Sequence, residues 1–265
     1  MEDWNGKDIE VCCNERGKIA TLHPDQNLIK GKAIKWPPPE LARKISQKSM
    51  DSCHCENVQL LNDKWKLGYF CKLQAINNVS ALVWSAFGTV MKAKKKILED
   101  WTSELFKQLK INDAIAEDTQ MFLWRKLPPC KTLTVPNSEL DVILSTRNCI
   151  LFFITSWSDK QSNAFKEEIR QKLMALCEFL KSESPFEILK NRIYGIVGVG
   201  YNDNVLDGID IPAEFCKFGT SWHQLCALKN HPYALELQRY YRWKEKYSYI
   251  TDGNGANVAE AELIA

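Results

Sequence analysis

Two apolar runs separated by a short polar turn constrain the fold of this chain most strongly. Residues 139–144 read "ELDVIL", residues 149–156 read "CILFFITS", and the four residues "STRN" lie between them. Apolar and β-branched runs of this length favour strands, and a short polar connection favours an antiparallel pair. The sequence therefore predicts a β-hairpin with one acid, Asp141, inside its first strand.

The segments around this hairpin predict an α/β domain. Apolar residues at three-to-four spacing after Ser80, a candidate N-cap, indicate a long amphipathic helix with a break near Gly88 or Lys96. A helical pattern after the hairpin leads to another apolar strand, so we expect a helical crossover and a mixed sheet. The elements predicted are helices at 80–109, 158–182 and 221–247 (one or two) and strands at 121–127, 139–144, 149–156 and 192–201.

The N-terminal quarter has a different composition. Two cysteine clusters, "VCCNE" and "SCHCE", and the proline run "KWPPPE" interrupt any periodicity, apart from a short helix expected at "LARKIS". We therefore predict an irregular, Cys/Pro-rich extension over residues 1–77, a main domain over 78–250 and a loose tail over 251–265.

The charge balance is nearly even, with 35 Lys and Arg against 33 Asp and Glu. A formal charge of +2 argues neither for nor against a polyanionic partner. The start has no basic region followed by an apolar run, and no apolar stretch reaches the roughly 18 residues of a membrane span. We expect a soluble, intracellular protein without a membrane partner.

The order of these elements, with an aspartate in the second of three strands, resembles the PD-(D/E)XK nuclease-like superfamily. "ALVWSAF" (81–87) is similar to the start of that family's first helix, and "RQKLMALCEFL" (170–180) is similar to its crossover helix. The resemblance implies a restriction-endonuclease-like mixed β-sheet flanked by helices over residues 78–250, with the N-terminal extension outside it.

The family's catalytic motif is only partly present. By resemblance, Asp141 takes the position of the motif aspartate, Ile154 that of the glutamate and Ser156 that of the lysine. The family uses carboxylates around Mg²⁺ to hydrolyse phosphodiesters, and isoleucine offers no oxygen to a metal. We therefore expect a protein without catalysis or cofactor that binds a protein partner or a nucleic acid.

An active Mg²⁺-dependent DNA endonuclease is the alternative. Glu139 shares a strand face with Asp141, and Glu167 and Glu168 follow in the next helix, so these acids could complete a metal site around Asp141. The other interpretation takes them as solvated surface charges. Asp141 itself could instead accept a hydrogen bond from a neighbouring side chain or a backbone amide.

The cysteines allow two interpretations. Cys53, Cys55 and Cys71 in "CHCENVQLLNDKWKLGYFC" are the residues that could bind zinc, although a second regularly spaced pair is missing. Most of the ten cysteines lie singly in apolar runs, which favours reduced thiols packed as small hydrophobic side chains.

Overall fold

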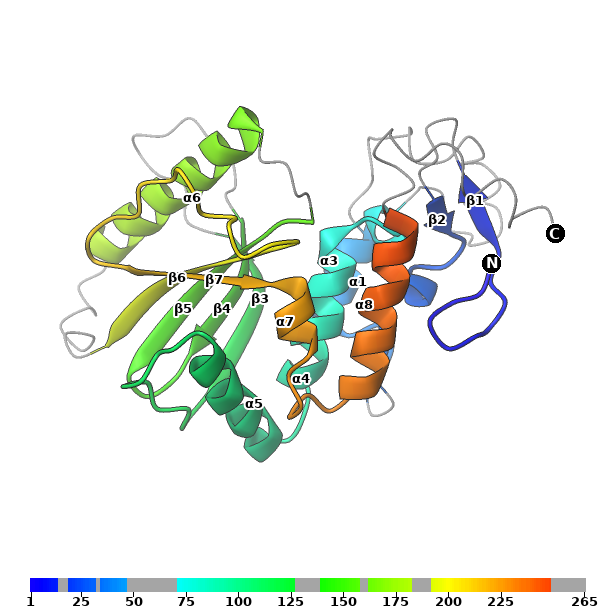
Figure 1. The fold of residues 1–265 in the computed structure, drawn as a ribbon, viewed down its shortest axis with the longest axis horizontal. Coiled ribbons are helices and arrows are strands. Elements are labelled where there is room, and N and C mark those ends of the chain that lie inside the picture. Colours follow the sequence, from blue (N-terminus) through cyan, green and yellow to red (C-terminus); the bar gives the residue numbers. More distant parts are fainter. Residues whose placement is uncertain are drawn as a thin grey trace. The chain divides into compact units, whose positions relative to one another are not determined.

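The chain divides into two compact units in the computed structural model (Figure 1), which describes residues 1–13, 19–31, 34–46, 71–126, 139–157, 162–182 and 192–248. One unit consists of Met1–Thr89 and Tyr233–Ala265, and the other consists of Val90–Pro232. The boundary predicted between residues 77 and 78 lies inside the first unit. The predicted tail, residues 251–265, lies outside the described residues.

The unit Val90–Pro232 is built on a five-stranded mixed sheet. Its strands lie in the order in which they occur in the chain: the first three pair antiparallel, and the last two continue the sheet in parallel. A mixed sheet was predicted from the hairpin and its crossover, and the structure confirms it. The strands are β3 (Gln120–Lys126), β4 (Glu139–Ser145), β5 (Cys149–Thr155), β6 (Ile193–Gly200) and β7 (Cys216–Ser221).

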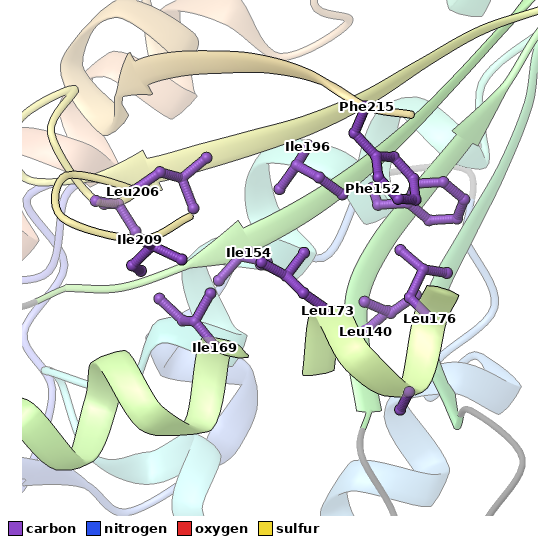
Figure 2. Close-up of a cluster of buried hydrophobic side chains, with 12 residues drawn as sticks. Leu140, Phe152, Ile154, Ile169, Leu173, Leu176, Ile196, Leu206, Ile209 and Phe215 are labelled. Atoms are coloured by element: carbon purple, nitrogen blue, oxygen red, sulfur yellow. The ribbon is translucent and has the colours of Figure 1, made fainter. Parts of the chain in front are cut away.

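Helices lie on opposite faces of this sheet, with α5 (Lys95–Gln108) on one side and α6 (Asn163–Ser182) on the other (Figure 1). The short helix α7 (Trp222–Cys226) follows β7 directly. The apolar stripe of α6 packs on β4, β5 and β6 and on the 201–215 connection, as Figure 2 shows. This cluster contains Leu140, Phe152, Ile154, Ile169, Leu173, Leu176, Ile196, Leu206, Ile209 and Phe215.

The other unit contains short elements and one longer helix. The strands β1 and β2 pair antiparallel, and the helix predicted after the proline run forms α1. Its elements are β1 (Val11–Cys13), β2 (Ile19–Thr21), η1 (Pro24–Asn27), α1 (Pro39–Ser46), η3 (Lys72–Gln74), α3 (Val79–Val83), η4 (Trp84–Gly88) and α8 (Ala234–Ser248). The chain passes to the second unit within α4 (Thr89–Met91).

The long helix predicted from Ser80 begins earlier and is interrupted twice. Asn78 is the N-cap, since its side chain accepts a hydrogen bond from the backbone N–H of Ala81 at 3.2 Å. The η4 segment is π-helical, and a Cβ on Gly88 would lie only 2.3 Å from the Trp84 ring, so glycine is required there. A second break precedes Lys95, where α5 begins. Among the described residues, no helix is both long and apolar enough to cross a membrane.

Candidate functional site

Asp141 lies where the pairing between β4 and β5 ends. The last pair of this ladder is Val142 with Phe153, so Asp141 is the next β4 residue beyond it. The Asp141 Oδ2 atom accepts hydrogen bonds from the backbone N–H and from the hydroxyl of Thr155, both at 2.9 Å. The half-buried carboxylate therefore satisfies a backbone donor just past the end of the ladder.

Ile154, which the resemblance aligns with the motif glutamate, belongs to the hydrophobic core. Its side chain is only 2% exposed and lies in the apolar cluster with Ile169 and Leu173 of α6 (Figure 2). A carboxylate at this position would have to be buried among hydrocarbon side chains, which is costly without a paired cation. This position contributes packing between β5 and α6.

Ser156, which the resemblance aligns with the motif lysine, is also buried, and its backbone joins three elements. Its N–H donates to the carbonyl of Val199 at 2.8 Å, and its carbonyl accepts from Trp222 Nε1 at 2.7 Å. The end of β5 is thereby fixed against β6 and α7. The next residue, Trp157, is half-buried and makes an edge contact with Tyr201 at a ring-centroid distance of 6.5 Å.

The three other candidate carboxylates have different surroundings. Glu167 is exposed and lies with its Oε2 atom 3.6 Å from Arg170, while its Oε1 atom accepts from Gln171 at 3.2 Å. Glu168 is also exposed, but its Oε1 atom lies 2.8 Å from the Nζ atom of Lys172. Glu139 is half-buried on β4, two residues before Asp141.

Lys172 is the partner of Glu168, and the sequence analysis did not select it. Its side chain is only 16% exposed. Burial lowers the pKa of this ammonium, but the charge of Asp141, the hydrogen bond and charge of Glu168, and the charge of Glu139 together raise the pKa above its ordinary value. Glu168 thus forms an ion pair with Lys172. The charges of Asp141 and Glu139 also act on this lysine, whereas Glu167 pairs with Arg170.

A local signal for Lys172 exists in the sequence. Lys172 follows Glu168 by four positions and precedes Leu173, so it lies on the border of the apolar stripe of α6. Such a border position commonly buries the alkyl chain of a lysine and leaves its ammonium near polar groups. Asp141 and Glu139, whose charges also act on Lys172, lie on β4, so the periodicity of the helix cannot indicate them.

The cysteine candidates are only partly described. Cys53 and Cys55 lie outside the described residues. Cys71 is fully buried, its thiol donates to the carbonyl of Lys44 at 3.8 Å, and burial raises its pKa to about 11. In the ranges given above, no three His, Cys, Asp or Glu side chains form a group that could hold a metal ion.

Comparison with known proteins yields no relative. No protein family matches this chain, and neither a curated protein nor a solved structure matches it. The chemistry of the site is therefore inferred from the surroundings of Asp141, Ile154, Ser156 and Lys172.

Proposed function

We propose that this protein has a restriction-endonuclease-like fold of the PD-(D/E)XK kind, has lost metal-dependent phosphodiester cleavage, and acts as a binding module for a protein or a nucleic acid. The order of elements in the unit Val90–Pro232 supports the proposed fold. Helix α5 is followed by three antiparallel strands, then by the crossover helix α6 and the parallel strand β6. The aspartate lies in the middle one of these three strands.

One observation carries the proposed loss of cleavage. The position that resembles the metal-binding glutamate holds Ile154, whose side chain packs in the core under α6. Magnesium requires oxygen ligands in near-octahedral geometry, and a buried isoleucine supplies none. At the same time the carboxylate of Asp141 is bound by the N–H and hydroxyl of Thr155. Asp141 and Ile154, which the resemblance would assign to catalysis, therefore both have structural roles in the β4–β5 pair.

A cleavage assay tests this proposal. The purified chain is incubated with supercoiled plasmid, linear duplex and single-stranded DNA, with Mg²⁺, Mn²⁺ or EDTA. We expect no metal-dependent products, and the same result for the Asp141→Ala variant. Metal-dependent cleavage by the unmodified chain that Asp141→Ala abolishes would contradict the proposal. Fluorescence anisotropy with labelled duplex in EDTA then separates a nucleic-acid partner from a protein partner.

An active Mg²⁺-dependent DNA endonuclease remains a second candidate because of one observation. The charges of Asp141 and Glu139 from β4 and of Glu168 from α6 all act on Lys172. If they bind a metal during cleavage, Asp141→Asn and Glu168→Gln should each abolish metal-dependent cleavage. Glu167→Gln is the matched control and should leave cleavage unchanged, because Glu167 pairs with Arg170 instead.

A further inference from the structure

The exposed side chains of α8 lie on one side of the helix, and most of them are cationic. Within residues 234–247, the exposed side chains are those of Leu235, Arg239, Arg242 and Lys246. They follow one another at positions i, i+4, i+7 and i+11, a spacing that places residues on one face of a helix. This surface, which we name the α8 stripe, presents three positive charges and no acid to solvent.

The opposite face of α8 is fixed in the core of its own unit. Tyr240 and Trp243 are buried there. The Tyr240 hydroxyl donates to the carbonyl of Asn27 at 2.8 Å, and Trp243 Nε1 donates to the carbonyl of Glu2 at 2.9 Å. Because these contacts hold the helix in one orientation, the cations of the α8 stripe have to face away from this core.

The two acids of α8 do not neutralise the stripe. Glu236 and Glu245 are half-buried, and at about 100° per residue each lies roughly a quarter turn away from the line of the stripe. Glu245 also accepts a hydrogen bond from the Tyr241 hydroxyl at 3.2 Å. In the part of the chain that the structure describes, neither Arg239 nor Arg242 forms an ion pair.

The exposed cations of α5 have different surroundings. Lys95, Lys96 and Lys107 are also exposed, but Lys95 lies 2.9 Å from Asp118, and Lys96 lies 2.9 Å from Asp100. Most of the positive charge of α5 is therefore compensated locally. The nearly even charge of the whole chain thus contains a local positive excess on α8.

The composition of the α8 stripe favours a polyanionic partner. Protein interfaces are centred on apolar and aromatic anchors, whereas the stripe offers only Leu235 at one end. A helix that binds a membrane surface inserts its apolar face, and the apolar face of α8 is buried in its own unit. Nucleic acids are bound mainly through Lys and Arg contacts to phosphates, and an arginine can donate two parallel hydrogen bonds to one phosphate. We infer that the α8 stripe binds the phosphate backbone of a nucleic acid.

This inference rests on the proposed role as a binding module and selects a nucleic acid as the partner. The cations from Arg239 to Lys246 span about 10 Å of helix axis, and a duplex carries a charge about every 1.7 Å, so each cation can reach a phosphate. Phosphate contacts carry no sequence information, so we expect binding with little sequence preference. The stripe belongs to the other compact unit than Asp141 does.

Binding to a short labelled DNA duplex tests the inference. Fluorescence anisotropy in EDTA measures the Kd of the purified chain between about 50 and about 200 mM NaCl. Three phosphate contacts predict a slope of about −2.7 for log affinity against log salt, so affinity should fall roughly fortyfold over this range. The triple variant Arg239→Gln/Arg242→Gln/Lys246→Gln should lose most of this slope and bind about tenfold more weakly, or worse, at the low salt concentration.

Two control variants accompany this measurement. Lys95→Gln/Lys96→Gln/Lys107→Gln removes the same number of positive charges from α5 and should leave most of the affinity and the slope. Arg239→Lys/Arg242→Lys keeps the charges of the α8 stripe and should keep the slope. All of these side chains are exposed, so the urea midpoints should stay close to that of the unmodified chain and show that the variants are folded.

Absence of duplex binding by the unmodified chain would overturn the inference. Equal weakening by the α8 and α5 triple variants would also overturn it, because net charge rather than the stripe would then be responsible. Binding to phosphatidylserine vesicles without binding to the duplex would assign the stripe to an anionic membrane surface and refute a nucleic-acid partner. The cleavage assay separates the two proposals: metal-dependent cleavage refutes the proposed loss of cleavage, whereas absence of both cleavage and duplex binding refutes only the nucleic-acid partner.

Discussion

Two lysines, one in each compact unit, are largely removed from water in opposite surroundings. Lys172 of the sheet-containing unit is 16% exposed and interacts with carboxylates, which raise its pKa. Lys244 of the other unit is fully buried on α8, and desolvation lowers its pKa to about 7. Its Nζ atom donates to the carbonyls of Ile76 and Asn78 and to the side-chain oxygen of Asn27.

The difference between the two lysines shows that neutral oxygens can satisfy the hydrogen bonds of a buried ammonium but do not keep its pKa high. Carbonyl oxygens satisfy the N–H donors of Lys244, but their partial charges do not offset the loss of hydration. The same region forms a polar network in which Asn27 Nδ2 donates to the carbonyls of Leu73 and Ala75, both at 2.7 Å. The Tyr240 hydroxyl donates to the carbonyl of Asn27 at 2.8 Å. Lys244 therefore has a structural role in this network, whereas Lys172 forms an ion pair with Glu168.

Removing the Lys244 side chain should have the largest effect on stability. Lys244→Ala leaves a cavity beside α8 and removes the donor of the three oxygens named above. We therefore expect a loss of about 3 kcal/mol in the free energy of unfolding. Urea unfolding measures it. Lys246→Ala on the exposed face of the same helix is the control, with an expected change below about 0.5 kcal/mol. Equal losses for the two variants would contradict a buried structural role.

The pH dependence of stability should separate the two lysines. The pKa of Lys244 is about 7 in the folded chain and 10.5 in its ordinary state, so the unfolded chain binds more protons between these values. Stability should therefore rise with pH, by roughly 2 kcal/mol from about pH 7 to about pH 9, and Lys244→Met should remove this rise.

Lys172 should behave in the opposite way. Its pKa is raised in the folded chain, so its contribution is fully present below 10.5 and is lost only as the pH rises above that value. Lys172→Gln should therefore keep the rise in the free energy of unfolding between about pH 7 and about pH 9. Urea unfolding at several pH values tests both statements, and loss of this rise in Lys172→Gln rather than in Lys244→Met would reverse the assignment.

A double-mutant cycle measures the coupling between Asp141 and Lys172. Asp141→Asn removes the charge but keeps an oxygen that can accept from Thr155. We expect it to destabilise the protein by about 1 kcal/mol alone and by less in the Lys172→Gln background. Additive effects of the two substitutions on urea unfolding would mean that the two residues do not interact.

The smallest effect is expected at an exposed pair. Lys96→Gln removes the ion pair with Asp100, which lies on the solvent side of α5. Because water screens such pairs, the urea midpoint should stay within experimental error. A loss comparable to that of Lys172→Gln would show that burial does not distinguish the two lysines.

Most elements of the sheet-containing unit could be predicted because their signal is local. The apolar runs at 139–144 and 149–156 correspond to β4 and β5, and the run at 192–201 corresponds to β6. Strand β7 was not predicted. It reads "CKFGTS", has largely exposed side chains, and forms because β6 offers it a parallel edge to pair with.

The candidate site was predictable only in part. Asp141, Ile154 and Ser156 were selected by resemblance to the family's motif, and that resemblance stays a prediction. Lys172 was missed because nothing in a helical pattern tells which strand residue will face it. The prediction of Ser80 as the N-cap was wrong, because Asn78, two residues earlier, makes the capping hydrogen bond.

The sequence by itself determined the alternation of strands and helices, because side-chain periodicity and turn residues act over a few positions along the chain. It also determined that position 154, which the resemblance aligns with the motif glutamate, is apolar. Only the tertiary structure decided that the charges of two β4 acids act on a lysine of α6. This depends on where the apolar stripe of α6 packs on the sheet. The packing of many side chains that are distant in sequence determines that position.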